Sequence, residues 1–158
     1  MLGGWYAHLA RGRPQTALFV NEATLLPVLL PLAPSATLLD RFPAELGLVL
    51  AAHGVDKDVI DRDIAAMAEH ATRTTSSRSL VGMLNEFVFL AGHRSQHDPD
   101  LDLTELSVAL ARTPCSPLYK RHVSPDRELA ALLGLSTSRG RGPVLASSPA
   151  PDDSQPIA

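Results

Sequence analysis

The chain has a single cysteine, few aromatic residues and almost no lysine. These shortages limit the kinds of structure and function that the chain can have. One cysteine excludes an intramolecular disulfide and a cysteine-based zinc cage, and it fits a reducing cytoplasm. With only 4% aromatic residues, the core must consist mainly of leucine, valine and alanine. The net charge is −3 and there is no long basic run, so nucleic-acid binding through a strong electrostatic footprint is not favoured.

Long apolar runs are also missing. The run 25–32 is far too short to span a membrane and contains two prolines, and the N-terminus lacks the basic-then-apolar pattern of a secretory signal. We therefore expect a cytoplasmic protein that does not associate with membranes. The preference for arginine over lysine, together with abundant alanine, leucine and proline, is typical of a GC-rich bacterial genome.

The remaining composition is sufficient for one globular domain. Hydrophobic residues make up 45% of the 158 residues, which is enough to bury a core. Residues 136–158 differ, because 11 of these 23 residues are Ser, Gly or Pro, and such a segment cannot bury enough surface to offset its ordering entropy. We predict one domain over residues 1–135 and a disordered tail over 136–158.

The first third of the chain predicts a three-stranded antiparallel meander. Strand candidates are 5–11, 16–20 and 24–30, separated by turn signals at 12–14 and 21–23. Pro27 removes a backbone donor, so the third strand should lie at an edge or be bulged. Residues 69–74 are short, polar and β-branched, and they are a candidate fourth strand.

Apolar residues then recur at helical spacing. Helices are expected at 38–53, 56–67, 77–93, 103–111 and 125–133. The first could instead begin near Pro43, while Asp102 or Thr104 caps the fourth. Pro125 opens the last helix and Gly134 closes it. The predicted class is α+β, with a small antiparallel sheet of three to four strands packed against four to five helices.

The most specific local pattern lies in the central helix. At 100° per residue, Leu80, Leu84, Phe87, Val88 and Ala91 fall on one face. The opposite face carries Arg78, Gly82, Asn85 and Phe89, within about 60° of one another. Glycine costs about 1 kcal/mol relative to alanine inside a helix, so Gly82 indicates a close approach by another backbone or a ligand, or crowded packing. We expect this second face to be buried or to bind something.

Arg78 is the anchor of the predicted site. It falls in the first helical turn, where free N–H groups and the helix dipole favour an anion, and its guanidinium offers a planar fork to a carboxylate or phosphate. We predict a ligand-binding site formed by Ser77, Arg78, Ser79, Gly82 and Asn85. The alternative is structural: Ser77 caps the helix, Arg78 pairs with a carboxylate of its own fold, and Asn85 satisfies a neighbouring backbone.

The candidate metal ligands are weak. His93 and His97 are four residues apart and share a helix face, but nothing nearby supplies a secure third ligand. The run Asp98-x-Asp100-x-Asp102 fails as a calcium loop, because Leu103 and Ala109 occupy the positions that require Gly and Glu. We expect no metal and no cofactor.

The candidate catalytic groups are equally incomplete. Cys115 has His122 as the nearest base in the sequence, and a partly buried, unreactive thiol is the favoured interpretation. Phosphate-binding loops, nucleophile elbows and the zinc-protease helix motif are absent. No complete acid–base or nucleophile set is present, so the catalytic residues are unknown and an enzymatic role is the less favoured one.

Four motifs carry a family resemblance: Trp5-Tyr6-Ala7-x-Leu9, Leu18-Phe19-Val20-Asn21-x-x-Thr24-Leu25, Arg78-Ser79-x-x-Gly82-x-x-Asn85 and Arg112-Thr113-Pro114. Together they resemble a bacterial domain-of-unknown-function family, number 6933, over roughly residues 4–133. The helix motif is the most specific, and Glu86 stands where the family has Asp. Family members usually carry a further basic and apolar segment before the Trp, which indicates a truncated or misassigned start here and a missing strand or helix. The resemblance implies no known activity, and it directs attention to the helix at Arg78.

We infer a non-enzymatic binding or regulatory module that recognises an anionic group, a partner's carboxylate or a nucleic-acid phosphate through Arg78. One alternative is a small enzyme of unfamiliar type, with a cleft around Arg78 and Asn85 lined by His70 or His93. Another is a structural protein with a buried Arg78 that acts through an apolar dimer interface. A concave pocket with a perturbed histidine favours the enzyme, and a flat, Arg-edged surface favours the binding module. The sequence does not determine the ligand, the partner or the oligomeric state.

Overall fold

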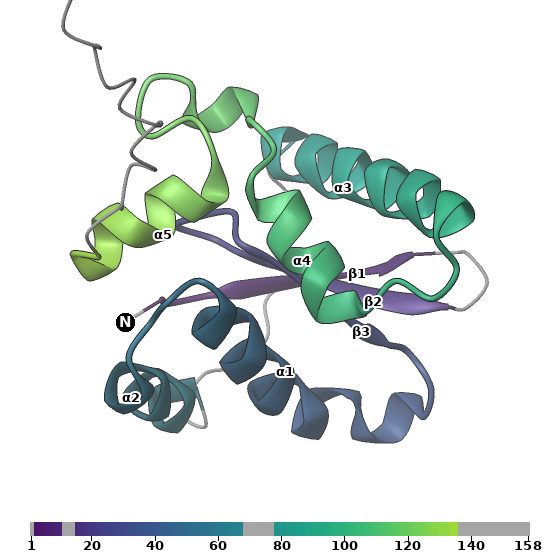
Figure 1. The fold of residues 1–158 in the computed structure, drawn as a ribbon, viewed down its shortest axis with the longest axis horizontal. Coiled ribbons are helices and arrows are strands. Elements are labelled where there is room, and N and C mark those ends of the chain that lie inside the picture. Colours follow the sequence, from purple (N-terminus) through teal and green to yellow (C-terminus); the bar gives the residue numbers. More distant parts are fainter. Residues whose placement is uncertain (1, 11–14, 68–77, 136–158) are drawn as a thin grey trace, which may run out of the picture.

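The computed structural model describes residues 2–10, 15–67 and 78–135 (Figure 1). The elements follow the chain in the order β1 (Trp5–Ala10), β2 (Thr16–Asn21), β3 (Pro27–Pro31), the short 3-10 helix η1 (Ser35–Thr37), α1 (Leu38–Ala52), α2 (Lys57–Met67), α3 (Arg78–His97), α4 (Leu103–Ala111), the short 3-10 helix η2 (Ser116–Leu118) and α5 (Pro125–Leu133). The predicted α+β class is confirmed. The candidate strand at 69–74 and the predicted tail at 136–158 lie outside the described residues.

The three strands form an antiparallel sheet in the order β1-β2-β3. Asn21 N donates to Leu26 O at 3.0 Å, and because an antiparallel ladder alternates, residues 27, 29 and 31 turn their backbone groups away from β2. Prolines occupy two of these outward positions, where a missing N–H costs no ladder bond. The edge position predicted from Pro27 is therefore confirmed.

Helix α4 closes the same edge. The remaining outward N–H of β3, that of Leu29, donates to Ser107 Oγ at 2.9 Å. The Ser107 hydroxyl in turn donates to Leu103 O at 2.7 Å, one turn earlier on α4. Both partners are buried, so this bond fixes α4 against the sheet and satisfies the remaining outward-facing backbone donor of β3.

One face of the sheet packs on α1 and α2. Aromatic rings meet there: Phe19 and Phe42 stack with centroids 4.2 Å apart, and Trp5 meets Phe42 edge-on at 5.1 Å. Such pairs add about 0.5–1.5 kcal/mol each beyond the area that they bury. Aliphatic residues complete this core, including Ala17, Leu26, Val28, Leu30, Leu46, Val49, Leu50, Val55, Ile60, Ala111 and Leu129.

The opposite face packs on α3 and α4, so the sheet lies between two helical layers and α5 sits at one end (Figure 1). This second core is aliphatic apart from Phe87 and Cys115. Its buried members are Leu18, Val20, Leu25, Leu29, Leu80, Met83, Leu84, Phe87, Ala91, Leu106, Leu110, Cys115 and Leu118. None of the helices in the described ranges is long and apolar enough to cross a membrane.

The helix ends follow the sequence signals closely. The Asp102 carboxylate caps α4, accepting from Thr104 N at 2.8 Å and Glu105 N at 3.1 Å. Pro125 is the first residue of α5, and Gly134 ends that helix with a positive φ of 66°. Helix α1 begins at Leu38 and includes Pro43, rather than starting beside that proline.

Asn21 organises the turn between β2 and β3. Its Oδ1 accepts from Ala23 N, Thr24 N and Thr24 Oγ1, and its Nδ2 donates to Leu2 O and Gly4 O. Asn21 and Thr24 are both buried, so a turn motif in the sequence is explained by internal hydrogen bonding.

Candidate recognition surface on helix α3

Helix α3 is amphipathic, and within the described part of the chain one of its faces is packed. Leu80, Met83, Leu84, Phe87 and Ala91 are buried against the sheet and α4. Four of the five residues of the predicted apolar face are buried, and the fifth, Val88, is half-buried. The helix continues to His97, beyond the expected end at residue 93, because no breaking residue intervenes before Pro99.

The opposite face of α3 is exposed. Arg78, Ser79, Gly82 and Asn85 all lie at the surface, and 73% of Phe89 is exposed. The buried alternative for this face is therefore wrong, because no other described element packs over it. Ser77, the fifth predicted site residue, lies outside the described residues. We call Arg78, Gly82, Asn85 and Phe89 the α3 stripe.

Gly82 has no packing reason in the described part of the chain. A Cβ built at this position meets no atom within 4 Å, so neither crowding nor a close backbone explains the glycine. It still costs about 1 kcal/mol of helix stability relative to alanine. Gly92, later on the same helix, has equally open surroundings among the described residues.

The α3 stripe runs lengthwise along the helix. At 1.5 Å per residue, Gly82 lies about 6 Å, Asn85 about 10 Å and Phe89 about 16 Å along the axis from Arg78. His93 lies about 22 Å from Arg78 by the same rise, too far to share one small cleft. His70, the other histidine proposed for that cleft, falls outside the described ranges.

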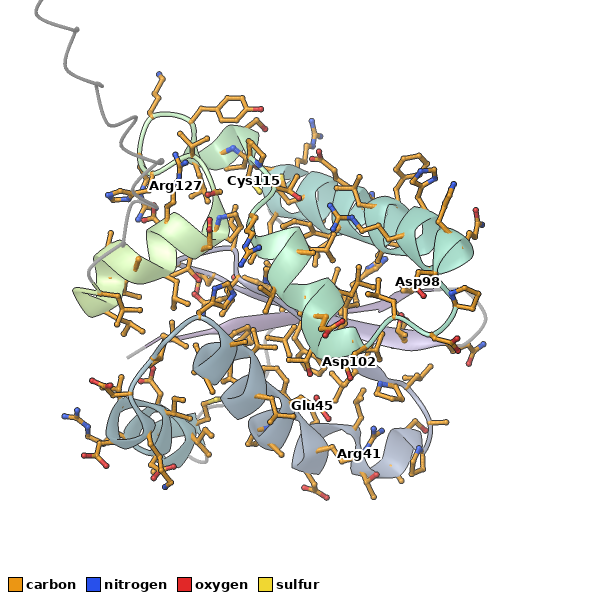
Figure 2. All side chains as sticks on the ribbon, in the orientation of Figure 1. Arg41, Glu45, Asp98, Asp102, Cys115 and Arg127 are labelled. Carbon is orange, nitrogen blue, oxygen red and sulfur yellow. The ribbon has the colours of Figure 1, made fainter. Side chains whose placement is uncertain are left out.

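The C-terminal end of α3 carries charges of both signs, because Arg94 and His97 lie in its last turn and three aspartates follow it. Arg78 stands at its first residue, whereas Asp98, Asp100 and Asp102 follow its last turn and are all exposed. Figure 2 shows Asp98 beside the connection from α3 to α4 and Asp102 at the beginning of α4. The helix dipole has the same polarity, positive at Arg78 and negative at the aspartates.

The two histidines near the end of α3, His93 and His97, contact each other. The rings of His93 and His97 lie 4.4 Å apart, and His97 Nδ1 lies 2.8 Å from His93 O. Within the described ranges, no three potential metal ligands come together.

Cys115 lies in the loop after α4 and is fully buried (Figure 2). Burial raises the pKa of its thiol to about 12, and the nearby Glu86 carboxylate adds to the increase. The base that the sequence offered, His122, is directed elsewhere: its Nδ1 lies 2.7 Å from Glu128 Oε2. The geometry therefore favours an unreactive thiol over a nucleophile.

Glu128 forms a buried polar centre that no sequence motif indicates. Only 4% of this residue on α5 is exposed, and its two carboxylate oxygens bind Arg121 and His122. The bonds tie the loop between η2 and α5 to the helix and neutralise the buried charge. Both basic residues precede Glu128 by six or seven positions, across a loop with Val123 at a φ of 75°, so helical spacing gives no signal for the contact.

Comparison with known proteins identifies the family and nothing beyond it. Residues 1–128 match the sequence profile described as domain of unknown function (DUF6933), so the chain belongs to this family. Neither curated proteins nor solved structures give a match.

Proposed function

We propose that this DUF6933 member is a non-enzymatic binding or regulatory module of the bacterial cytoplasm, which docks a carboxylate-bearing protein partner on the α3 stripe. The observation that carries the proposal is the combination of an exposed Arg78 and a largely exposed Phe89 with an unexplained Gly82 between them. Asn85 adds a polar group on the same side of the helix, and the exposed Ser79 flanks it.

The residue types suit a protein interface. Arginine and aromatic side chains are enriched among the residues that dominate binding energy. Burial of an exposed phenylalanine contributes about 1.5–3 kcal/mol, and the guanidinium of Arg78 can form paired hydrogen bonds with a carboxylate. Gly82 leaves room for a partner side chain to approach the helix backbone.

The charge distribution favours a protein over a nucleic acid. Arg78 is the one arginine on the α3 stripe, within a chain of net charge −3. A phosphate backbone would be expected to meet several basic side chains, whereas a single carboxylate beside apolar groups matches Arg78 and Phe89.

Site-specific photocrosslinking tests the proposal. A photoreactive phenylalanine analogue is placed at Asn85 in one strain and at Leu48 in a control strain; Leu48 is 55% exposed on α1, across the sheet. We expect a crosslinked protein from position 85 only, lost with Arg78→Glu, and a crosslinked partner segment that contains carboxylates and apolar residues. Equal crosslinking at both positions, or crosslinking to nucleic acid, would contradict the proposal.

A further inference from the structure

We propose that His53 makes the docking of α5 sensitive to acid, so that protonation of its ring releases α5 from the ends of α1 and α4 before the rest of the fold unfolds. The inference concerns a different part of the molecule from the α3 stripe and is independent of the proposed function. It follows from the position of one imidazole between three helices.

His53 stands at the C-terminal end of α1, where three helices meet. Leu50 of α1, Ala111 of α4 and Leu129 of α5 are buried in the same core cluster. The His53 side chain is half-buried, and its Nε2 atom is enclosed and has no hydrogen-bond partner among the described residues. This position suits a neutral ring, because neutral imidazole carries an N–H on only one of its two nitrogens.

Charged groups face His53 from both neighbouring helices. Arg112 follows the last residue of α4, and Asp126 lies in the first turn of α5. Burial lowers the pKa of His53, Asp126 opposes this decrease, and Arg112 adds to it. The positive form of the ring is therefore disfavoured while α5 is docked, although an anion is close by.

Protonation gives the ring a second N–H and a positive charge near Arg112. A buried donor without an acceptor is costly. The nearby carboxylate is already engaged, because Asp126 accepts from the Ser124 hydroxyl and from Arg127 N, the latter at 2.8 Å. Movement of α5 away from α1 exposes the imidazole to water and removes this cost, so protonated His53 favours an open position of α5.

Helix α5 is the element that moves at this junction. It is only nine residues long, and short elements with few buried contacts open at a lower free energy than the core. Helix α1 is held to the sheet by the stacking of Phe42 on Phe19. Helix α4 is held by the bond from Leu29 to Ser107. The carboxylate of Glu128 binds the loop that precedes α5, so these bonds move with α5 and do not oppose its release.

Hydrogen exchange of the full chain between pH 5 and 8, read by mass spectrometry and corrected for the pH dependence of unstructured peptides, tests the proposal. We expect the protection of α5 to fall below about pH 6.5, by up to about tenfold per pH unit for one proton, while α1 and β2 keep theirs. In His53→Gln, which lacks the titrating ring, the protection of α5 should be the same at every pH. The matched control His93→Gln removes an exposed histidine on α3 and should behave as the wild type.

Two outcomes of this experiment would overturn the inference. One is an equal loss of protection of α5 in the wild type and in His53→Gln. The other is a loss that appears in α1, the sheet and α5 together, because it would mark global unfolding. Titration of the His53 ring by nuclear magnetic resonance in the wild-type chain needs no variant: it should give a pKa below the ordinary 6.5, and a value at or above 6.5 would also overturn the proposal.

Discussion

Ser107 on α4 accepts the backbone N–H of Leu29 on β3, with 2.9 Å between Leu29 N and Ser107 Oγ. The other two outward positions of β3 are prolines, which have no N–H. With the Leu29 N–H bonded to Ser107, β3 has no free outward N–H that could pair with another strand. It also couples the sheet to the helical layer that presents α3. The bond is thus a structural link between the core and the proposed recognition surface.

Ser107→Ala should destabilise the protein. The variant leaves the buried Leu29 N–H without its acceptor, which costs about 1–3 kcal/mol. Urea unfolding at neutral pH measures the change in the free energy of unfolding. Ser116→Ala, an exposed serine in η2, serves as the control and should change it by less than about 0.5 kcal/mol. A Ser107→Ala variant as stable as this control would contradict the role of the bond.

Cys115 should be unreactive in the native protein. Its pKa of about 12 keeps the thiol protonated at pH 8, and the thiolate is the reactive form. Reaction with Ellman's reagent should therefore be negligible in buffer and stoichiometric in denaturant. A rapid stoichiometric reaction of the folded chain would show that the thiol is accessible and ionised, and would reopen its role as a nucleophile.

His53, at the C-terminal end of α1, should make stability depend on pH. Burial lowers its pKa below the ordinary 6.5, the nearby Asp126 opposes this shift, and Arg112 adds to it. The unfolded chain then binds the proton more readily than the folded chain. The free energy of unfolding therefore keeps the full contribution of His53 above about pH 6.5, and it declines as the pH falls from there toward the lowered pKa of His53. Unfolding of the wild type and His53→Gln between pH 5 and 8 should show a smaller decline in the variant. Parallel curves would contradict the assignment.

The local features of the fold were predictable because the residues that produce them are close in sequence. Pro27 indicated an edge strand, and Asp102, Pro125 and Gly134 marked helix ends, each through its own backbone chemistry. The exposed and packed faces of α3 were separated correctly, but the exposed face was expected to be buried or to bind. Exposure depends on which elements pack nearby, and helical periodicity carries no such information.

The polar contacts between distant segments could not be predicted in this way. Ser107 is 78 residues from Leu29, and an isolated serine in a helix gives no sign of its partner. Glu128 stands in the first turn of α5, where acidic residues are common, and nothing in its sequence position shows that it is buried and binds Arg121 and His122. Such contacts depend on tertiary packing, which single-sequence patterns do not encode.

The central claim is that Arg78 serves recognition rather than folding, and one paired measurement on Arg78→Ala tests it. The melting temperature and photocrosslinking from position 85 are measured on the same variant. We predict a melting temperature within about 2 °C of the wild type, together with about 10- to 100-fold weaker binding from the loss of a charged hydrogen bond. A variant that melts far below the wild type, or that binds its partner unchanged, would contradict the account.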